Sequence, residues 1–491
     1  MTYIASIDVG TTNVKGALIT RDGAIHASCQ VEIDTLYDDD YVEQDPEHWW
    51  KAFIEITNTW HRAGVHFNDI AMISLCGQMQ DVIPIDRSGS PVRNAILYSD
   101  TRAEKQAARI LEKSKEIESC TRNECNAATP FAKIKWLEEN EPSTFTRTAS
   151  FLFSSKDFLI YHLTDKSATD VTTAATTGLM DMEKRAWLSD LAGEEGVSVW
   201  QLPDLHEPEE IAGHVTRYAS ECTGFVPGTP VLCGQGDAGA TTSGAGVVHP
   251  GDRYMYVGTT GWVATTTSDL DTSSTAIFQL AHLSKQYIKV IPLTNVGSAH
   301  EWAVQTLCRE FSDKKAAYNT FENMVRSTIP AENGVLFLPY LTSERFPVHV
   351  SQAAGSFLRV SSSTTSSHLA RAVMEGIAFS IRQSMETLTA PQDKPITLLG
   401  GGARSKALAQ IMSDICQREL HVPENAENLP ILGVAAMAFI RLGWCKTYQE
   451  FAENILHPMP KTRYIPNYEN QPVYEKLYAA FKRIYPAIKD I

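Results

Sequence analysis

The chain has 491 residues, of which 43% are hydrophobic and 21% are charged. This composition excludes a largely disordered protein. The length predicts two or three domains, because a single core rarely organises more than about 300 residues. The formal net charge of −15 disfavours extended binding to nucleic acid or to an anionic membrane surface. We therefore expect neither nucleic acid nor a membrane among its partners.

The nine cysteines are odd in number and scattered over the whole chain. This pattern favours reduced thiols over a disulfide framework. The N-terminus lacks the basic region and apolar stretch of a signal peptide. The longest apolar run, residues 431–440, is about half of the ~20 residues that a membrane helix needs. The sequence therefore predicts a cytoplasmic protein.

The first elements in the chain form a predicted hairpin. A short strand ends at Gly10-Thr11-Thr12, a second covers residues 14–20, and a turn at 21–23 leads to a third. The same order of strand, Gly-Thr-Thr and strand returns at Gly258-Thr259-Thr260, about half the chain later. This short repeat is what two related lobes would give, and we expect them to be joined near residues 243–253.

Between the repeats, strand-like segments alternate with amphipathic helical ones, which indicates an α/β fold. Asp45 is a predicted helix cap, and Pro46 follows in the first turn, where its missing N–H costs nothing. A Ser/Thr tract precedes a helix that begins near His368. Strands are expected at residues 70–75 and 231–233, and helices at residues 46–60, 101–117 and 131–139.

Three glycine-rich segments are candidates for binding a nucleoside triphosphate. Two are the Gly-Thr-Thr loops, and the third is residues 400–405, Gly-Gly-Gly-Ala-Arg-Ser. Glycine and threonine leave backbone N–H groups and small hydroxyls free to converge on phosphate oxygens. Any one of these loops could be an ordinary turn, but the three together favour a nucleotide site. Neither a Walker loop nor a dinucleotide fingerprint is present.

Two charged residues flank the first of these loops. Asp8 can hold hydrated Mg²⁺, and Lys15 can neutralise a phosphate oxygen. A third charged residue, Asp237, stands on a glycine-flanked turn after an apolar strand, where its carboxylate can accept a proton from an alcohol. The alternative is that Asp237 caps a helix that starts at Ala238, and both roles can hold at once. A helix N-terminus would lower the proton affinity of this base.

In order and spacing, these motifs resemble the FGGY carbohydrate kinases of the sugar kinase/Hsp70/actin superfamily. The segment from Pro130 to Asn140 is similar to one family signature, and Gly355 to Glu375 is similar to the other. Two positions depart from these signatures. Ala128 replaces the usual first residue of one signature, and Arg359 stands where the other normally has glycine. Neither position touches the predicted chemistry.

The resemblance implies two actin-like (ribonuclease H-like) α/β lobes, with ATP and a sugar in the cleft between them. The lobes would be residues 1–245 and 246–491, and the last helix, residues 473–485, is expected to pack back on the first lobe. Asp237 would be the catalytic base, and Asp8 and Asp237 would hold Mg²⁺. The resemblance is also compatible with a homodimer. The implied nucleotide-binding residues are Asp8, Gly10, Thr11, Thr12, Lys15, Gly258, Thr259, Thr260, Gly401, Gly402, Ala403 and Ser405.

The family's substrate strip is similar to residues 74–81 of this chain. The implied substrate contacts are Gln78, Met79, Gln80, Asp100 and the base Asp237. Met79 could instead fill the core, Gln80 could be a surface residue and Asp100 could pair with Arg102. The position of Asp100 after an apolar strand favours a substrate contact.

Three changes in this strip and near the base leave the sugar open. Gln80 and Asp81 replace the His and Gly usual in xylulokinases, and Ala238 stands where many members carry Asn or Gln. A ketopentose such as xylulose is the leading expectation, and other ketoses, polyols and aldonates are alternatives. An actin-like or Hsp70-like ATPase and a sugar sensor without turnover are alternatives from other classes. The sequence provides a reason for Asp237 only in a kinase.

Overall fold

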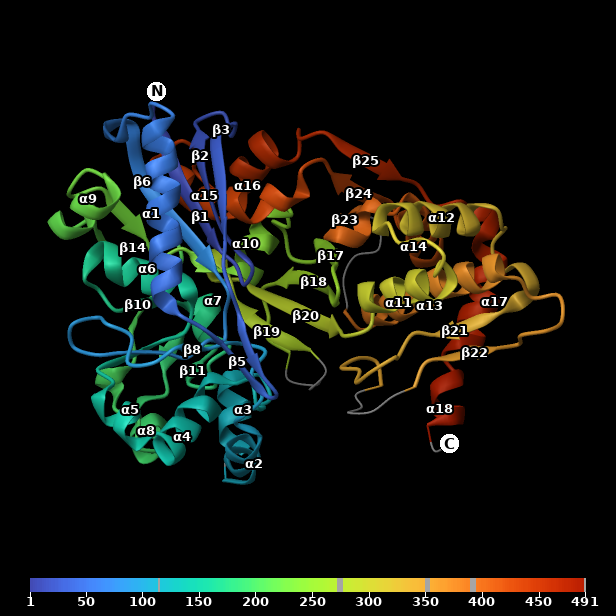
Figure 1. Ribbon diagram of the computed structural model, residues 1–491, viewed down its shortest axis with the longest axis horizontal. Coiled ribbons are helices and arrows are strands. Elements are labelled where there is room, and N and C mark those ends of the chain that lie inside the picture. The colour runs from blue at the N-terminus through green and yellow to red at the C-terminus, as the bar shows by residue number, and fades with distance from the viewer. Residues whose placement is uncertain (114, 272–276, 349–353, 389–393, 490–491) are drawn as a thin grey trace.

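A computed structural model describes residues 1–491 except 114, 272–276, 349–353, 389–393 and 490–491. Two lobes, each built on a sheet flanked by helices, lie next to each other (Figure 1). The α/β class and the two-lobe architecture predicted from the sequence are confirmed. No helix in the described part of the chain is both long and apolar enough to cross a membrane.

The sheet of the first lobe has the strand order β14-β15-β6-β1-β2-β3, and β16 also pairs with β6. The predicted hairpin at the N-terminus is present, because β1 and β2 are antiparallel. β6 runs parallel to β1, so both strands end at the same edge of the sheet. The strands are β1 (Tyr3–Val9), β2 (Asn13–Thr20), β3 (Ile25–Glu32), β6 (Ile70–Gly77), β14 (Ile211–His214), β15 (Pro230–Leu232) and β16 (Gln235–Gly236).

The second lobe repeats this arrangement. Its sheet has the order β19-β20-β18-β17-β23-β24-β25, in which β17 is antiparallel to β18 and parallel to β23. In both lobes an antiparallel unit, of three strands in the first lobe and four in the second, is therefore extended by parallel strands on the side of its first strand. The strands are β17 (Arg253–Val257), β18 (Gly261–Thr267), β19 (Phe278–Ala281), β20 (Tyr287–Leu293), β23 (Ile396–Leu399), β24 (Leu420–Pro423) and β25 (Lys461–Tyr464).

The helices cover the two sheets. α1 begins as predicted: the Asp45 carboxylate accepts the Glu47 N–H at 3.0 Å and Pro46 occupies the first turn. The segment expected as one helix at 101–117 contains the starts of two, α2 and α3. The helices of eight or more residues are α1 (Pro46–Arg62), α2 (Glu104–Lys113), α4 (Pro130–Asn140), α6 (Ser155–Thr164), α10 (Asp237–Gly244), α11 (Gly297–Leu307), α12 (Lys314–Arg326), α13 (Ser366–Thr387), α14 (Lys406–Cys416), α15 (Leu429–Arg441) and α17 (Gln471–Phe481).

Shorter elements complete the fold, several of them beside α2 and α4 at one end of the first lobe (Figure 1). The remaining α-helices are α3 (Lys115–Thr121), α5 (Pro142–Arg147), α7 (Val171–Ala174), α8 (Ser189–Glu194), α9 (Arg217–Thr223), α16 (Tyr448–Phe451) and α18 (Ile484–Ile488). The remaining strands are β4 (Leu36–Asp38), β5 (Tyr41–Gln44), β7 (Ile83–Ile85), β8 (Ala95–Ile96), β9 (Ser150–Leu152), β10 (Ala168–Asp170), β11 (Met180–Asp181), β12 (Ala186–Trp187), β13 (Asp204–His206), β21 (Leu336–Leu338) and β22 (Ser356–Leu358).

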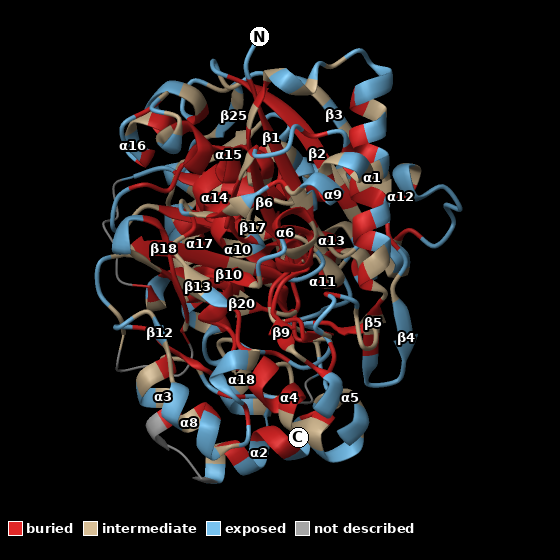
Figure 2. Ribbon diagram, turned by 90° about the vertical axis from the view of Figure 1, so that its left-hand side faces the viewer, coloured by how far each residue is buried: buried red, intermediate tan, exposed pale blue. Residues whose placement is uncertain are grey.

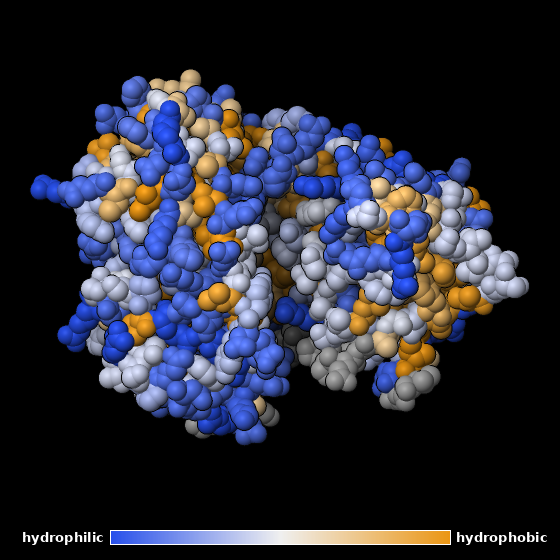
Figure 3. Space-filling model, viewed as in Figure 1, coloured by the Kyte–Doolittle hydropathy of each residue, from blue (hydrophilic) through white to orange (hydrophobic). Residues whose placement is uncertain are grey.

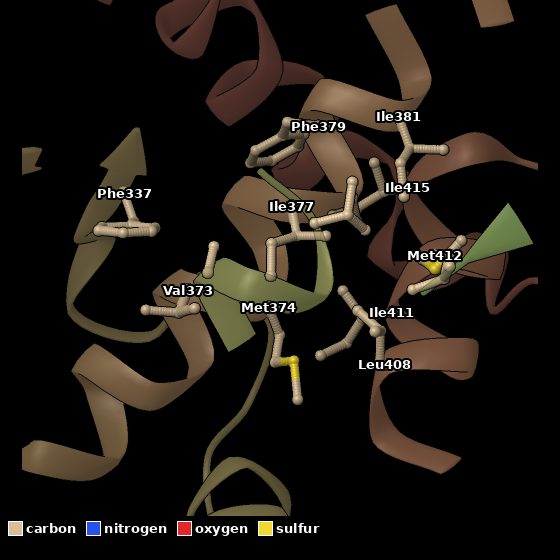
Figure 4. Packing of buried hydrophobic residues seen from close by; sticks show 14 of the residues in the cluster. Phe337, Val373, Met374, Ile377, Phe379, Ile381, Leu408, Ile411, Met412 and Ile415 are labelled. Atoms are coloured by element: carbon tan, nitrogen blue, oxygen red, sulfur yellow. The ribbon is translucent and has the colours of Figure 1, made fainter. Parts of the chain in front are cut away.

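The core of the second lobe is formed where α13 and α14 pack together (Figure 4). Ile377 of α13 and Ile411 of α14 are almost completely buried in it, and Phe337 of β21 closes one end. Helix α17, which contains most of the predicted last helix, belongs to this core, because Tyr474 and Tyr478 pack against Phe379 of α13. The expectation that the last helix packs on the first lobe is therefore wrong. The apolar face of α17 packs against the core of the second lobe.

A different helix crosses to the first lobe. α15 packs against β1, β6 and α10, and the Ser74 hydroxyl of β6 donates to the Val434 carbonyl of α15 at 2.7 Å. Its residues are buried on nearly every side, as the long apolar run in the sequence requires of a helix inside a protein. Figure 2 shows the same concentration of buried residues around β1, β6 and α10. α10 and α15 therefore form a packed connection between the lobes.

Candidate active site

Asp237 is placed by the close approach of its own strand to the centre of the first sheet. β16 pairs with β6, so that Gly236 lies beside Gly77. A side chain at Gly236 would overlap the sulfur of Met79, and one at Gly234, where φ is +68°, would overlap the Leu75 carbonyl. These glycines let β16 come close enough to deliver Asp237 at the edge where β1 and β6 also end. Asp8, next to the last residue of β1, reaches the same edge.

The environment of Asp237 makes its carboxyl group a weaker acid than that of an ordinary aspartate. The side chain is open to solvent on one side, and its carboxylate accepts the Ala238 N–H at 2.7 Å. The surrounding protein removes much of its hydration, and together with the charge of Asp8 this raises the pKa of Asp237 to about 7. The expected lowering by the helix N-terminus is therefore wrong, because desolvation and a like charge outweigh one backbone hydrogen bond.

Asp8 lies beside Asp237 in a less open position. Burial raises the pKa of Asp8, and the positive charge of Lys15 opposes this effect. Lys15 is the direct partner of Asp8 across the β1–β2 hairpin. Among the described residues, no three His, Cys, Asp or Glu side chains come together as a preformed metal site. The two carboxylates do fit Mg²⁺, which usually takes one or two carboxylates and completes its shell with water and phosphate oxygens.

Buried glutamine side chains support the first Gly-Thr-Thr loop. The Gly10 N–H donates to the Asn13 carbonyl at 3.0 Å and closes the turn. The Thr11 hydroxyl donates to Gln78 Oε1 at 2.9 Å, and Gln78 Nε2 donates to Gln44 at 2.9 Å. Gln78 is only 1% exposed. Its side chain therefore orients the loop in this arrangement, while Thr12 projects into solvent.

The second Gly-Thr-Thr loop rests on the start of α11. The N–H groups of Gly297 and Ser298 donate to the carbonyls of Gly258 and Thr259 at 3.0 and 2.9 Å. A side chain at Gly297 would overlap the Gly258 carbonyl, so the close contact needs a glycine there. With its carbonyls held by the helix, the loop leaves Thr259 and Thr260 exposed.

In the third glycine-rich segment, different residues face solvent and protein. Gly400 has a φ of +88° and turns the chain, and Gly401 is exposed with open space where a side chain would stand. Ala403 is 7% exposed. The Ser405 hydroxyl caps α14 by accepting the Leu408 N–H at 3.1 Å and donates to Glu322 at 2.6 Å. Gly401 is therefore the residue of this loop whose backbone is accessible, and Ser405 attaches the loop to α12.

Around the substrate strip, the structure places most of the predicted residues beneath the surface. Met79 is 6% exposed and packs in a core cluster under Gly236, as its alternative interpretation proposed. Gln80 has a φ of 65°, and its carbonyl accepts from Lys133 at 2.9 Å. Lys133 also donates to the Leu97 carbonyl at 2.6 Å. This buried amine therefore ties the strip to the strand end before Tyr98.

Asp100 does not reach the site. Its side chain is 0% exposed and forms a bidentate ion pair with Arg102, with a Nη2 to Oδ2 distance of 2.7 Å. The Val42 N–H donates to the same carboxylate at 2.7 Å. The preference for a substrate contact is therefore wrong for this arrangement, and Asp100 is an ion-pair partner. Two groups hold the Asp100 carboxylate in this position. Arg102 is two residues away in the sequence, and Val42 is 58 residues away.

Two tyrosines that the sequence did not single out lie within the electrostatic influence of Asp237. Burial, and to a smaller extent the charge of Asp237, raise the pKa of Tyr98 and of Tyr256. Tyr98 follows β8 in the first lobe and Tyr256 lies on β17 in the second, so the charge of Asp237 acts on groups from both lobes. A recess separates the two halves in Figure 3. One feature of the sequence could have indicated Tyr256 as a site residue: it precedes a Val-Gly-Thr-Thr segment, as Asp8 does.

Two family models match this chain and decide its classification. The N-terminal domain of the FGGY family of carbohydrate kinases matches residues 3–244, and the C-terminal domain matches residues 254–442. The chain belongs to the FGGY family of carbohydrate kinases. It is therefore a phosphotransferase that acts on a carbohydrate hydroxyl.

Curated relatives of this FGGY kinase align along all or most of its length. The xylulose kinase of Bacillus subtilis is 28% identical over 100% of this chain and 98% of that protein. The gluconokinase of the same organism is 27% identical over 92% of this chain and 90% of that protein. Among solved structures, the xylulose kinase from Lactobacillus acidophilus superposes with a TM-score of 0.91 at 24% identity, covering 100% of this chain and 99% of that one. This last similarity supports the fold.

Proposed function

We propose that this FGGY kinase transfers the γ-phosphate of ATP to a hydroxyl of D-xylulose. The observation that supports the chemistry is the position of Asp237, a carboxylate with a pKa near 7 at the point where the first-lobe strands end and the second lobe faces them. The substrate is favoured by relatives. Proteins named xylulose kinase from Bacillus subtilis, Lactococcus lactis and Escherichia coli each align with 98% or more of this chain.

The proposed reaction uses Asp237 as the base. It accepts the proton of the sugar hydroxyl while that oxygen forms a bond to the γ-phosphorus, and the bond from phosphorus to the β,γ-bridging oxygen breaks to leave ADP. A base with a pKa near 7 is deprotonated in about half of the molecules at neutral pH and still has appreciable affinity for the proton. The carboxylate is held toward the site by the Ala238 N–H.

The other predicted residues position the phosphates. Backbone N–H groups of the two Gly-Thr-Thr loops, with Thr12, Thr259 and Thr260 exposed beside them, are suited to phosphate oxygens from the two sides. Lys15 adds a positive charge at the first loop. Asp8 and Asp237 would hold Mg²⁺, which neutralises phosphate charge when bound. Gly401 offers an unobstructed backbone to the adenosine.

An aldonate such as gluconate is the second candidate substrate. A relative named gluconokinase covers most of this chain, and a structure titled gluconate kinase from Lactobacillus acidophilus superposes with a TM-score of 0.90 at 24% identity. Gln80 and Asp81 occupy the positions where the xylulokinase-type strip has His and Gly. Asp81 is 0% exposed, however, so in this arrangement its carboxylate does not face a substrate.

A coupled assay of ADP release over a panel of ketoses, alditols and sugar acids tests this proposal. We expect turnover that depends on sugar and is fastest with D-xylulose. Turnover fastest with gluconate would replace the substrate and keep the reaction. Turnover independent of sugar would instead indicate an ATPase, and its absence would indicate a sensor. Asp237→Asn, run beside the parent, separates turnover by this site from a contaminating kinase.

We further propose a cytoplasmic homodimer. All nine cysteines are free thiols, as a reducing compartment requires. Sedimentation of the purified chain over a tenfold concentration range measures the oligomeric state. We expect a mass of two chains, and a mass of one chain at every concentration would contradict the dimer.

A further inference from the structure

A second hollow of about 330 Å³ lies where the lobes are connected, and none of the predicted site residues line it. Its walls come from the chain segment that follows α10, from the start of β17, from β23 and β24, and from the first residue of α15. The last wall is the segment before β25. We call this hollow the basic cavity, because its lining includes Arg253, Lys394, His421, His457 and Lys461.

The charge of the basic cavity is opposite to that of the whole protein. The chain has a net charge of −15, yet five basic side chains line this hollow and Asp252 is its acidic lining residue. Asp252 is already neutralised, because Lys394 Nζ lies 2.6 Å from one of its oxygens and the N–H groups of Val248 and His249 donate to the other. His421 is paired with Glu419 at 2.7 Å, so the basic groups that no carboxylate of the cavity lining balances are those of Arg253 and Lys461.

Two of these cations lack an acidic partner among the described residues. Lys461 Nζ donates to the His457 carbonyl at 2.8 Å, which is a neutral acceptor. Arg253 is 7% exposed, it donates to the Leu388 carbonyl, and its Nε has no hydrogen-bond partner in the described part of the chain. Burial, together with the positive charge of Arg418, lowers the pKa of Arg253 to about 10. Cations in this state are stabilised by an anion in the hollow.

The backbone favours the same charge. α15 begins at Leu429 in the cavity wall and is thirteen residues long, and a helix N-terminus attracts anions through its partial positive charge. The volume is at the lower end of that of small-ligand pockets, about 300 to 1,000 Å³. This space admits a phosphate group with a small organic part. It leaves little room for a larger ligand.

We propose that the basic cavity is a binding site for a small phosphate, either inorganic phosphate or a phosphate monoester of sugar size. Lys394 and Lys461 would contact the phosphate oxygens from two walls, and the N-terminus of α15 would face them from a third. This site is separate from the predicted phosphate loops, so the proposal does not depend on whether the chain phosphorylates xylulose.

Calorimetric titration of the full-length chain with inorganic phosphate and with ribose 5-phosphate tests the site. We compare the parent with Lys394→Gln/Lys461→Gln and with a matched double variant, Lys51→Gln/Lys105→Gln, whose lysines are exposed on α1 and α2. We expect binding to weaken at least tenfold in the cavity variant and to stay unchanged in the matched one. Equal binding by all three proteins would overturn the proposal.

Two further measurements keep the result decisive. His457→Gln, at an exposed position, repeats the test if the double variant fails to fold. A crystal soaked in tungstate, a heavy analogue of phosphate, locates the ion by its anomalous signal; density in the basic cavity supports the site, and density only at the Gly-Thr-Thr loops overturns it. Tighter binding of ribose 5-phosphate than of inorganic phosphate identifies the ester as the occupant, and the reverse order identifies the free ion.

Discussion

The two Gly-Thr-Thr hairpins are alike in strand order, although the second turn is one residue shorter, and they differ in chemistry. In the first lobe, Val9 pairs with Val14 and Asp8 pairs with Lys15 across the strands. In the second lobe, Val257 pairs with Gly261, and the position equivalent to the Asp8–Lys15 pair holds Tyr256 and Trp262, whose rings stack with centroids 4.1 Å apart. One hairpin therefore presents charges beside its loop, and the other presents aromatic surface.

This difference indicates a division of labour between the lobes. The first lobe contributes the ionisable groups, Asp8 and Asp237, which lie at the shared edge of β1, β6 and β16. The second lobe contributes exposed backbone and hydroxyls from a loop seated on α11. Changes in the first lobe should therefore alter the rate of the chemical step, and changes in the second should alter nucleotide affinity. The following predictions would break or sharpen that division.

The largest effect is expected from removing the proposed base, Asp237. Asp237→Asn keeps the shape of the side chain and abolishes proton acceptance, so turnover should fall by about 10²- to 10⁴-fold. Nucleotide affinity should change little, because the phosphate loops remain. Steady-state kinetics and equilibrium binding of ATP measure the two quantities. Turnover equal to that of the parent would remove Asp237 from the role of base.

The pH dependence should show the coupling between the two carboxylates. Because the free enzyme must carry a deprotonated Asp237, kcat/KM should fall about tenfold per pH unit below a pKa near 7 and level off above it. Asp8→Asn removes the neighbouring negative charge and should move this limb to lower pH. Tyr256→Phe, at the equivalent position of the second hairpin, is the matched control and should leave the limb in place. A limb unmoved by Asp8→Asn would show that the carboxylates do not interact.

Much of this arrangement is predictable from local sequence. The repeated strand, Gly-Thr-Thr and strand pattern indicates two related lobes, and the Asp45-Pro46 start of α1 is present as expected. Asp8 and Asp237 can be proposed as partners because each stands at the end of a strand in an α/β sheet. These inferences succeed because they depend on turn chemistry and on strand ends, which a few residues determine.

The wrong expectations depend on contacts between distant segments. The apolar run of α15 predicts burial but does not specify which sheet covers it, and the amphipathic face of α17 does not specify its lobe. The pKa of Asp237 also depends on residues that are distant in the sequence. The helix start that would lower it is visible in the sequence, while the desolvation and the charge of Asp8 that raise it arise only in the folded chain.

A smaller effect is expected where the second hairpin rests on α11. Gly297→Ala would place a methyl group against the Gly258 carbonyl, so the loop or the helix must shift at a cost of about 1–3 kcal/mol. We expect a lower midpoint of thermal unfolding and a higher KM for ATP with little change in kcat. Gly193→Ala in α8, where nothing lies within 4 Å of the added methyl, is the control and should unfold no earlier than the parent. An unchanged KM for ATP in Gly297→Ala would show that this loop does not contribute to nucleotide binding.

The smallest and most selective effect is expected at Gly401. The structure has nothing within 4 Å of a methyl group placed there, so Gly401→Ala should fold with the stability of the parent. If adenosine approaches this backbone, the methyl group meets the nucleotide, and the KM for ATP should rise several-fold while the KM for sugar stays constant. Thermal unfolding and the two KM values distinguish this result from a general defect. An unchanged KM for ATP would show that the nucleotide is bound away from the third glycine-rich segment, and would confine the contribution of the second lobe to its hairpin.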